Sequence, residues 1–587
     1  MVDPYKMVYI NVLASLALLF GILFYRFVYP KRKINLFFLL ILISFLPVMS
    51  IFRKGVYESG DFNIHIYRIM SFYDSLREGH LMPSWAAELN ATYGNPLFIF
   101  NYSLSYYMIS FFHFIGFSFI ASMKIFLGLT FLSSGIFMYL WIKTLTDNHL
   151  AAFSSSVFYL FNPYHLIDFH FRATPGESSI FALAPLVLFF ITAYSRKRRF
   201  HFLILTSLFT ILLFLGHPLL SVVILGIIIL FTILVSLDNN DIISLFLSIS
   251  SLLIGIAASM YSWISFLLYA PYTFHNPSSE VSFNPFSQLF YSPWRLGFLF
   301  QGHQGELALI IGYTQLFVVF ASVFILLKYK ILVKIKKYYL FWISIFFLFL
   351  FLMSPLSKII WQFFPIFWML IPFGRLLLPT AICTSVIAGY FIIVFSNSRR
   401  KRKFIYILLV ITIASTILNW GHRRVIPKIG DDVLQRNVWK STMVEGQTAY
   451  FLNNKWADPN NFWFSELPKQ RLEIIQGKAI VKELKRTSVK HLYVINADTP
   501  ITIRENTLYF PGWSLKSNGN NIDIYPGKRG VINAGLPQGL QYIELTYDDL
   551  LMYKLSKIMS VGIFFSLLLT LIINRVLWTF CFFTRKP

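Results

Sequence analysis

The chain has 587 residues, of which 56% are hydrophobic and only 13% are charged, whereas soluble domains usually carry about 25% charged residues. Ordinary soluble cores could not bury so much apolar surface, so the composition excludes a cytosolic enzyme, a disordered chain and a secreted disulfide scaffold and leaves a polytopic α-helical membrane protein. The net charge of +25 comes from short basic runs between apolar stretches, which indicates membrane topology and not nucleic-acid binding.

Apolar stretches of about the length of a membrane-spanning helix recur along the chain, and thirteen of them predict such helices. They cover residues 7–29, 34–52, 121–142, 149–163, 178–195, 201–216, 219–236, 242–270, 305–328, 338–354, 374–396, 404–420 and 557–578. The first stretch is too long for a cleaved signal peptide and lacks a small-residue cleavage site, so we expect it to be retained. Cys383 and Cys581 lie in apolar stretches, and no structural disulfide is expected.

Basic runs orient the predicted helices, because Lys and Arg favour the cytoplasmic side of a membrane. These runs are 31–33, 196–199, 334–337, 399–403 and 585–586. Together they predict a plasma-membrane protein with its N-terminus outside and its C-terminus inside. Two further apolar segments, 97–117 and 355–373, are rich in aromatic residues or proline, and we expect them to lie at the outer membrane interface.

The outer side then carries loops 53–120, 163–177, 271–304 and 355–373, and a polar region over 421–556. Alternating residues in the second half of that region predict a β-sandwich-like domain. The expected strands are 478–486, 490–495, 500–510, 521–525, 529–534 and 540–546. The predicted organisation is a multi-pass domain over 1–420 with outer loop 53–120, an extracytoplasmic β-rich domain over 421–556, and a final helix with a cytoplasmic tail over 557–587.

The first outer loop places three ionisable side chains at helical spacing. If 61–79 is a helix, Asp61, His65 and Arg68 fall on one face at i, i+4 and i+7. A carboxylate beside an imidazole and a guanidinium suits the deprotonation of a hydroxyl next to a bound phosphate. The alternative is that Asp61 only caps a surface helix.

A second group of ionisable residues lies between two apolar stretches. His165, Asp168 and Arg172 could share one helix face, with Pro175-Gly176 ending that helix and Glu177 following it. Charges near lipid are costly, which favours a functional role. The alternative is an internal ion pair, Arg172 with Asp168 or Glu177, that only locks the loop.

Two more residues stand at the predicted outer ends of helices. His217 precedes Pro218 at a helix N-terminus, where an anion is favoured; the alternative is a histidine hydrogen-bonded for structure. Arg375 opens a helix, where a cation opposes the helix dipole and requires an anionic partner such as a lipid phosphate. The alternative is an arginine that reaches to the membrane interface.

Short motifs of this chain occur in an order that is similar to one family. They are LREGHLMPSW (76–85), YGNPLFIFNYSLSYY (93–107), PYHLIDFHFRATPGE (163–177), IPFGR (371–375) and LYFPGWSLKSNG (508–519). The chain resembles the bacterial membrane proteins called 6-pyruvoyl-tetrahydropterin synthase-related over about residues 53–580. It is also similar to the multi-pass proteins that glycosylate lipoteichoic acid, and both groups resemble the GT-C glycosyltransferase superfamily.

The resemblance implies a GT-C-type glycosyltransferase of the cell envelope. Such an enzyme moves a sugar from a polyprenyl-phosphate-linked donor to a cell-surface glycopolymer or a lipid-linked acceptor at the outer membrane face, and its catalytic acid maps onto Asp61. The residues expected to bind substrate are His65, Arg68, His165, Asp168, Arg172, Glu177, His217 and Arg375.

The resemblance leaves the cofactor open. Several GT-C members hold a divalent metal with two carboxylates, so Mg²⁺ or Mn²⁺ is a possible cofactor, but Glu58 and Asp61 stand at a wider spacing here. The alternative functions are a lipid-linked glycan transporter and a non-catalytic membrane scaffold. Transporters place ionisable residues near the bilayer midplane, whereas here they collect at the predicted outer edge.

Overall fold

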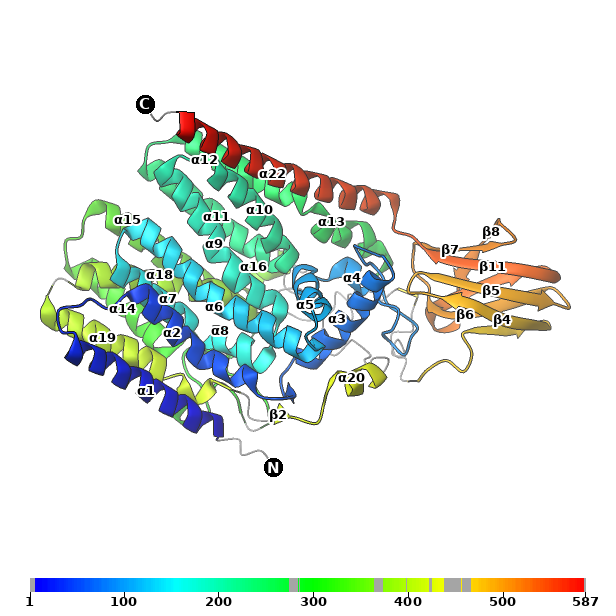
Figure 1. The fold of residues 1–587 in the computed structure, drawn as a ribbon, viewed down its shortest axis with the longest axis horizontal. Helices are drawn as coiled ribbons and strands as arrows, with labels where there is room; N and C mark the ends of the chain where they lie inside the picture. The colour runs from blue at the N-terminus through cyan, green and yellow to red at the C-terminus, as the bar shows by residue number, and fades with distance from the viewer. Residues whose placement is uncertain are drawn as a thin grey trace.

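In the computed structural model the chain is elongated, with a bundle of long helices at one end and a β-domain at the other (Figure 1). The last helix, α22, leaves the β-domain and runs back along the bundle. The structure describes residues 6–273, 283, 285–302, 304–363, 373–396, 398–421, 425–437, 455–456 and 466–584.

Within the described residues, eight helices are long and apolar enough to cross a membrane. They are α1 Lys6–Val28, α6 Phe119–Thr146, α9 Pro175–Lys197, α11 Pro218–Asp238, α15 Val333–Leu352, α18 Leu377–Phe395, α19 Arg399–Ala414 and α22 Leu551–Thr584. A ninth span arises if α12 Ile242–Ala258 and α13 Met260–Tyr269, which meet at a bend of 58°, are taken together. These helices support a multi-pass membrane protein.

Each of the thirteen predicted stretches contains a helix, but the count of thirteen spans is not confirmed. Outside these spans, four of the helices have fewer than 18 residues: α2 Leu36–Val48, α7 His149–Leu160, α10 His201–Gly216 and α14 Tyr313–Lys328. Helix α19 reaches spanning length only with the turn that follows it, as Arg399–Asn419. The stretch 305–328 becomes helical only from Tyr313, because Gly312 takes a φ of 111° that an α-helix cannot include.

Side-chain caps fix where several of these helices begin. The side chains of Asn35, Ser118, Asn148 and Asp241 accept hydrogen bonds from the first backbone N–H groups of α2, α6, α7 and α12. Such caps satisfy donors that have no partner inside the helix. The bundle is therefore built from apolar segments with polar start signals.

The loop after α2 forms several short elements beside the bundle. It contains β1 Val56–Tyr57, α3 Phe62–Arg77, α4 Leu97–Phe100 and α5 Leu104–Phe114. The expected aromatic segment 97–117 is thus two short helices. Other short helices are α8 Pro163–Ile167, α16 Lys358–Phe363 and α20 Asp431–Asn437. Part of the expected segment 355–373, residues 364–372, lies outside the described residues.

A two-residue ribbon ties this loop to a distant part of the chain. Strand β1 pairs antiparallel with β2 Val425–Ile426. Gly55 precedes β1 with a φ of 89°, and a Cβ atom there would collide with the carbonyl oxygen of Ile426. Only glycine therefore allows the two segments to approach so closely.

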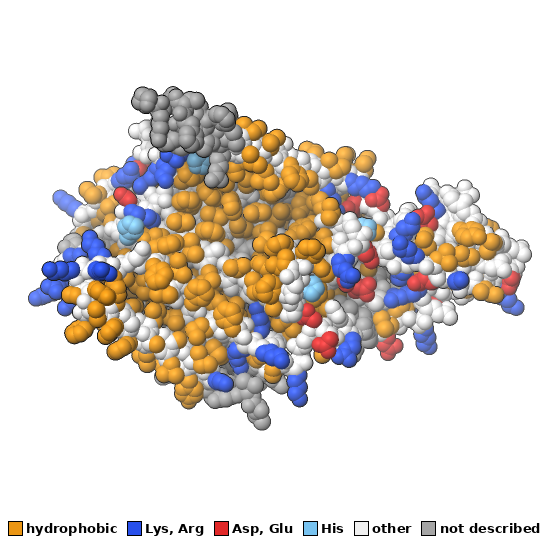
Figure 2. All heavy atoms as spheres, viewed as in Figure 1, with side chains coloured by type: hydrophobic (Ala, Val, Ile, Leu, Met, Phe, Trp, Pro, Cys, Tyr) orange, Lys and Arg blue, Asp and Glu red, His pale blue; other side chains and the backbone are white. Residues whose placement is uncertain are grey.

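Basic loops meet at the end of the bundle away from the β-domain (Figures 1 and 2). Lys334 lies 3.3 Å from Asp238, and Arg198 pairs with Asp241. Arg196 donates to the carbonyl oxygen of Leu145 at 2.6 Å. The basic loops and the β-domain thus lie at opposite ends, as the predicted topology requires; which end faces the cytoplasm stays a prediction.

The β-domain consists of two antiparallel sheets that share one apolar core. One sheet has the order β3-β6-β10-β9 and the other β4-β5-β11-β7-β8. The strands are β3 Leu472–Gln476, β4 Ala479–Arg486, β5 Lys490–Ala497, β6 Ile501–Leu508, β7 Trp513–Ser517, β8 Asn520–Ile522, β9 Ile524–Pro526, β10 Val531–Leu536 and β11 Gly539–Tyr547. Strands β3 and β7 were not expected, and the strand expected at 521–525 is divided into β8 and β9.

The core of the β-domain continues into the outer loop of the helical domain. The Trp85 ring packs edge-on against Trp513, with ring centroids 5.3 Å apart. The backbone N–H of Leu508 donates to the carbonyl oxygen of Tyr93 at 2.8 Å. Aromatic burial of this kind contributes strongly to an interface, so the loop that follows α3 fixes the β-domain to the bundle.

Candidate active site

The segment between α7 and α9 turns sharply beside the start of α3. Helix α8 passes at Asp168 into a π-helical turn, Asp168–Arg172. Ala173 then takes a left-handed conformation with a φ of 55°, and α9 begins at Pro175. The expectation that Pro175-Gly176 ends a helix is wrong, because proline at the first helical position starts the next one.

This turn brings two carboxylates and two guanidinium groups together. Arg172 Nη1 lies 2.8 Å from Asp168 Oδ1, and its Nη2 lies 2.8 Å from Glu177 Oε1. Arg375 Nε donates to the same Glu177 oxygen at 2.8 Å. Tyr164 accepts from Arg172 Nη1 at 2.9 Å and donates to Glu177 Oε2 at 2.7 Å. We call these five residues the helical cluster.

The helical cluster is almost completely removed from solvent. The side chains of Asp168 and Glu177 are 0% and 1% exposed, and those of Arg172 and Arg375 are 17% and 19% exposed. Isolated charges at such depth would cost several kcal/mol each, so they must compensate one another. Burial and the negative charge of Glu177 raise the pKa of Asp168.

Asp61 is attached to this turn by its backbone. The N–H groups of Gly60 and Asp61 donate to the carbonyl oxygens of Phe171 and Arg172, both at 2.8 Å. Asp61 precedes α3, but its side chain makes no capping hydrogen bond. The hydroxyl of Ser59 accepts from the N–H of Phe62 at 3.1 Å instead. The capping alternative therefore does not account for the carboxylate of Asp61.

His65 lies one helical turn after Asp61 and is held between two tyrosines. Its Nδ1 is 3.1 Å from the Tyr106 hydroxyl and its Nε2 is 2.9 Å from the Tyr102 hydroxyl. Burial lowers the pKa of His65 well below its ordinary value, and the positive charges of Arg68, Arg172 and Arg375 lower it further. His65 is therefore neutral, in a positive field produced by three guanidinium groups.

Arg68 and His217 complete the surroundings of His65. Arg68 is hydrogen-bonded to Tyr106, and this interaction works against the burial that raises the Tyr106 pKa to about 12. The His217 ring stacks on Tyr102 with centroids 5.3 Å apart. His217 Nδ1 also accepts from the N–H of Leu220 at 3.4 Å and caps α11. This nitrogen therefore has the structural role that was the alternative to anion binding.

His165 contacts a different set of groups. Its Nδ1 lies 3.1 Å from the carbonyl oxygen of Tyr159, and its ring stacks on Phe181 at 3.9 Å. Among the described residues, no hydrogen bond joins it to Asp168 or Arg172. The expected helix face is interrupted because the π-helical turn adds residues per turn after Ile167.

The residues present do not fit a metal held by carboxylates alone. In the part of the chain that the structure describes, no three His, Cys, Asp or Glu side chains converge to hold a metal ion. Asp168 and Glu177 already compensate Arg172 and Arg375, and Glu58 is exposed.

Sequence reasoning missed three tyrosines of the site: Tyr102, Tyr106 and Tyr164. A tyrosine in an apolar segment gives no signal of its own, because aromatic residues fill cores and interfaces everywhere in this chain. Gly176 was the available signal. A Cβ atom at Gly176 would lie 2.7 Å from the Tyr102 ring, so the glycine makes room for the tyrosine that contacts His65.

No family model and no curated protein matches this sequence. Among solved structures, the chain is similar to arabinofuranosyltransferase AftD from Mycobacteria, with 11–12% identity and a TM-score of 0.42 over 65% of this chain. It is also similar to the oligosaccharyltransferase AglB from Archaeoglobus fulgidus, in complex with an inhibitory peptide and a dolichol-phosphate, with 11% identity and a TM-score of 0.39 over 66% of this chain.

The matched region spans 26–27% of the AftD chain and 56% of the AglB chain. Identity this low leaves the activity of this chain to be argued from its own residues.

Proposed function

We propose that this protein is a GT-C-type membrane glycosyltransferase. It moves a sugar from a polyprenyl-phosphate-linked donor to a glycan or lipid-linked acceptor at the outer face of the plasma membrane. The observation that carries the proposal is the carboxylate of Asp61: it caps no helix, and its backbone is bonded to the turn that holds Arg172.

The field around His65 suits an anionic donor. Arg68, Arg172 and Arg375 all act on His65, so a lipid phosphate entering beside it meets three guanidinium groups, two of which are paired with Asp168 or Glu177. Both terminal nitrogens of Arg172 are bonded to carboxylates of the protein. We therefore assign phosphate binding to Arg68 and Arg375 by their position, and treat Arg172 as a positioning residue that shapes the turn.

The reaction then needs little beyond orientation and charge. The sugar–phosphate bond breaks, the lipid phosphate leaves as a stable anion, and the acceptor hydroxyl forms the new bond to the sugar. Asp61 takes the proton of that hydroxyl or stabilises the positive charge that develops on the sugar. Neutral His65, fixed by Tyr102 and Tyr106, adds a polar contact without adding a charge.

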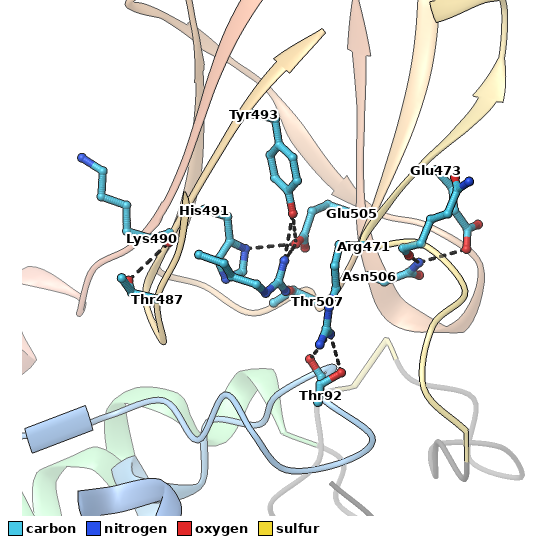
Figure 3. Close-up of polar contacts among 12 residues, drawn as sticks. Thr92, Arg471, Glu473, Thr487, Lys490, His491, Tyr493, Glu505, Asn506 and Thr507 are labelled. Carbon is cyan, nitrogen blue, oxygen red and sulfur yellow. Dashed lines mark hydrogen bonds and ion pairs between the residues drawn. The ribbon is translucent and has the colours of Figure 1, made fainter. Parts of the chain in front are cut away.

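The acceptor has a candidate position at the junction with the β-domain. A polar cavity of about 110 Å³ lies between the loop after α3 and the sheet. Trp85, Arg471 and His491 are among the residues that line it, and Figure 3 shows Arg471 reaching across the junction to Thr92. An aromatic ring beside polar groups is suited to a sugar.

The substitution Asp61→Asn tests the proposal. It keeps shape and backbone but removes the negative charge, and we expect a loss of about 10²–10⁴ in transfer rate. The readout is mass spectrometry of cell-surface glycopolymers in a strain that lacks the gene and carries the variant. Ser59→Ala is the matched control, because it removes the observed cap two residues away and leaves Asp61 intact.

The glycopolymer should be missing its added sugar with Asp61→Asn and complete with Ser59→Ala at equal protein levels. A complete glycopolymer with Asp61→Asn would overturn the proposal and favour the scaffold or transporter alternative.

A further inference from the structure

A second cavity lies at the opposite end of the bundle, among the basic loops. Its volume is about 270 Å³, and its walls come from α6, α9, α11, α15 and α18. Eight of its twelve lining residues carry a polar or charged side chain. They are Thr146, Thr192, Ser195, Arg196, Asn239, Lys334, Tyr338 and Tyr390. In a bundle this apolar, such a lining indicates a polar occupant.

The cavity has a buried floor and a cationic rim. Tyr338 and Tyr390 are only 6% and 4% exposed, and their rings stack with centroids 6.1 Å apart. Arg196 and Lys334 are exposed at the mouth. Arg196 donates to the carbonyl oxygen of Leu145, a neutral partner, so its positive charge acts on the cavity.

Two carboxylates oppose these cations. Asp238 lies 3.3 Å from Lys334 Nζ and 3.8 Å from Lys337 Nζ, and it accepts a long hydrogen bond of 3.4 Å from the Tyr338 hydroxyl. Asp147, which is paired with Lys143, also lies near Arg196, so four cations (Arg196, Lys334, Lys337 and Lys143) face two anions at this end of the bundle. The surplus is positive and calls for an anion in the cavity.

Apolar side chains beside the rim distinguish a lipid from a soluble anion. Leu237, Leu332 and Val333 are 64%, 74% and 71% exposed, next to Asp238 and Lys334 in sequence. Exposed apolar side chains at the ends of membrane helices are suited to contact acyl chains. Basic pockets between membrane helices suit the headgroups of anionic lipids.

We propose that this cavity, which we call the rim pocket, binds the phosphodiester headgroup of an anionic phospholipid. The phosphate lies between Arg196 and Lys334, the rest of the headgroup faces the tyrosine floor, and the acyl chains lie on Leu237, Leu332 and Val333. This site is separate from the Asp61 site and does not depend on the proposed glycosyl transfer.

Native mass spectrometry of the full-length protein in detergent, with added phosphatidylglycerol or phosphatidylcholine, tests the proposal. The variant Arg196→Gln/Lys334→Gln should bind phosphatidylglycerol about 30-fold more weakly than wild type, because each cation near an anionic headgroup contributes roughly a factor of five. The matched control is Lys143→Gln/Arg198→Gln. It removes two cations paired with Asp147 and Asp241 at the same end without touching the lining.

A further variant predicts a change of the opposite sign, so that misfolding cannot imitate the result. Asp238→Asn removes the competing anion and should tighten phosphatidylglycerol binding severalfold. Equal losses in the lining variant and the control would show general surface attraction and overturn the proposal, as would unchanged binding in Asp238→Asn. Binding of inorganic phosphate as tight as that of the lipid would overturn the lipid assignment.

Discussion

Two buried clusters of the same chemistry lie in different parts of this molecule. In the helical cluster, Glu177 is bonded to Arg172 and to the hydroxyl of Tyr164. In the β-domain, Glu505 is bonded to Arg486 at 2.8 Å. It also accepts from the hydroxyl of Tyr493 at 3.1 Å (Figure 3). Both glutamates are 1% exposed.

The difference lies in what each cluster has beyond its glutamate, arginine and tyrosine. The β-domain cluster adds His491, whose Nδ1 is 3.0 Å from Glu505. Its side chains come from β4, β5 and β6, so the cluster connects the two sheets. The helical cluster adds a second carboxylate, Asp168, and a second guanidinium, Arg375, and Asp61 is attached beside it. The same unit thus stabilises a fold in one place and borders a candidate reaction site in the other.

The largest loss of stability is expected when the central glutamate of the helical cluster, Glu177, loses its charge. Glu177→Gln leaves Arg172 and Arg375 buried with only Asp168 to compensate them. We expect a loss of about 3–5 kcal/mol in stability, as when one partner of a buried ion pair is removed. Thermal unfolding in detergent measures it. A change of roughly 1 kcal/mol in stability lowers the melting temperature by about 2–4 °C. A melting temperature that stays within this range of wild type would show that the cluster is not a compensated unit.

The β-domain cluster should be sensitive to acid. Burial alone would raise the pKa of Glu505, but Arg486 and His491 lower it from 4.5 to about 2. The folded domain therefore binds fewer protons than the unfolded chain, and this stabilisation is complete above about pH 4.5 and is lost as the pH falls toward 2.

Pepsin cleavage within residues 472–547, followed by mass spectrometry between pH 5 and 2, measures this effect. Wild type should become susceptible as the pH falls, whereas Glu505→Gln should be less stable, by roughly 2–3 kcal/mol, and should lack this part of the pH dependence. Identical profiles for both proteins would remove Glu505 as the titrating group.

Substituting each arginine by lysine separates fold from function. Arg172→Lys and Arg486→Lys keep the charge but lose the forked geometry, and each should cost about 1–2 kcal/mol. Arg172→Lys should reduce glycan transfer more strongly than Arg486→Lys, because Arg172 shapes the turn that holds Asp61, whereas Arg486 only lines the proposed acceptor cavity. Equal transfer by both variants, at matched expression, would place Arg172 in a purely structural role.

The smallest expected losses of stability, of similar size in the two clusters, come from removing the hydroxyl of each cluster's tyrosine. Tyr164→Phe and Tyr493→Phe each remove one hydrogen bond to a buried glutamate, for about 1–2 kcal/mol. Melting temperatures should fall by similar amounts, while glycan transfer should fall only in Tyr164→Phe. A loss of transfer in Tyr493→Phe would mean that the β-domain takes a direct part in the reaction.

The sequence was most informative where one local property decides the structure. Each of the thirteen stretches predicted from apolar length contains a helix, and period-two alternation predicted six strand regions of the β-domain. Strand β7, Trp513–Ser517, was missed because Pro511-Gly512 and Asn518-Gly519 read as turns with little room between them. The number of spans stays unconfirmed, because apolar helices such as α7, with 12 residues, are shorter than a typical membrane-spanning helix.

The site was predictable only in part, for a different reason. Asp168, Arg172 and Glu177 lie close in sequence, so spacing alone could propose their ion pairs, and the structure has them. Arg375 and Tyr102 reach the site from distant segments, and no local pattern reports a long-range contact. The capping alternative for Asp61 depended on whether its carboxylate accepts from the first N–H groups of α3, and sequence could not show that the hydroxyl of Ser59 accepts there and the carboxylate does not.

The ribbon between β1 and β2 has a consequence for how the protein is made. The strand that precedes Asp61 is completed by Val425–Ile426, and Arg375 also comes late in the chain. At roughly 5–20 residues per second, the ribosome needs tens of seconds between the first strand and its partner. During that time the Asp61 loop lacks its final neighbours, so we expect the candidate site to be assembled only after most of the chain has been synthesised.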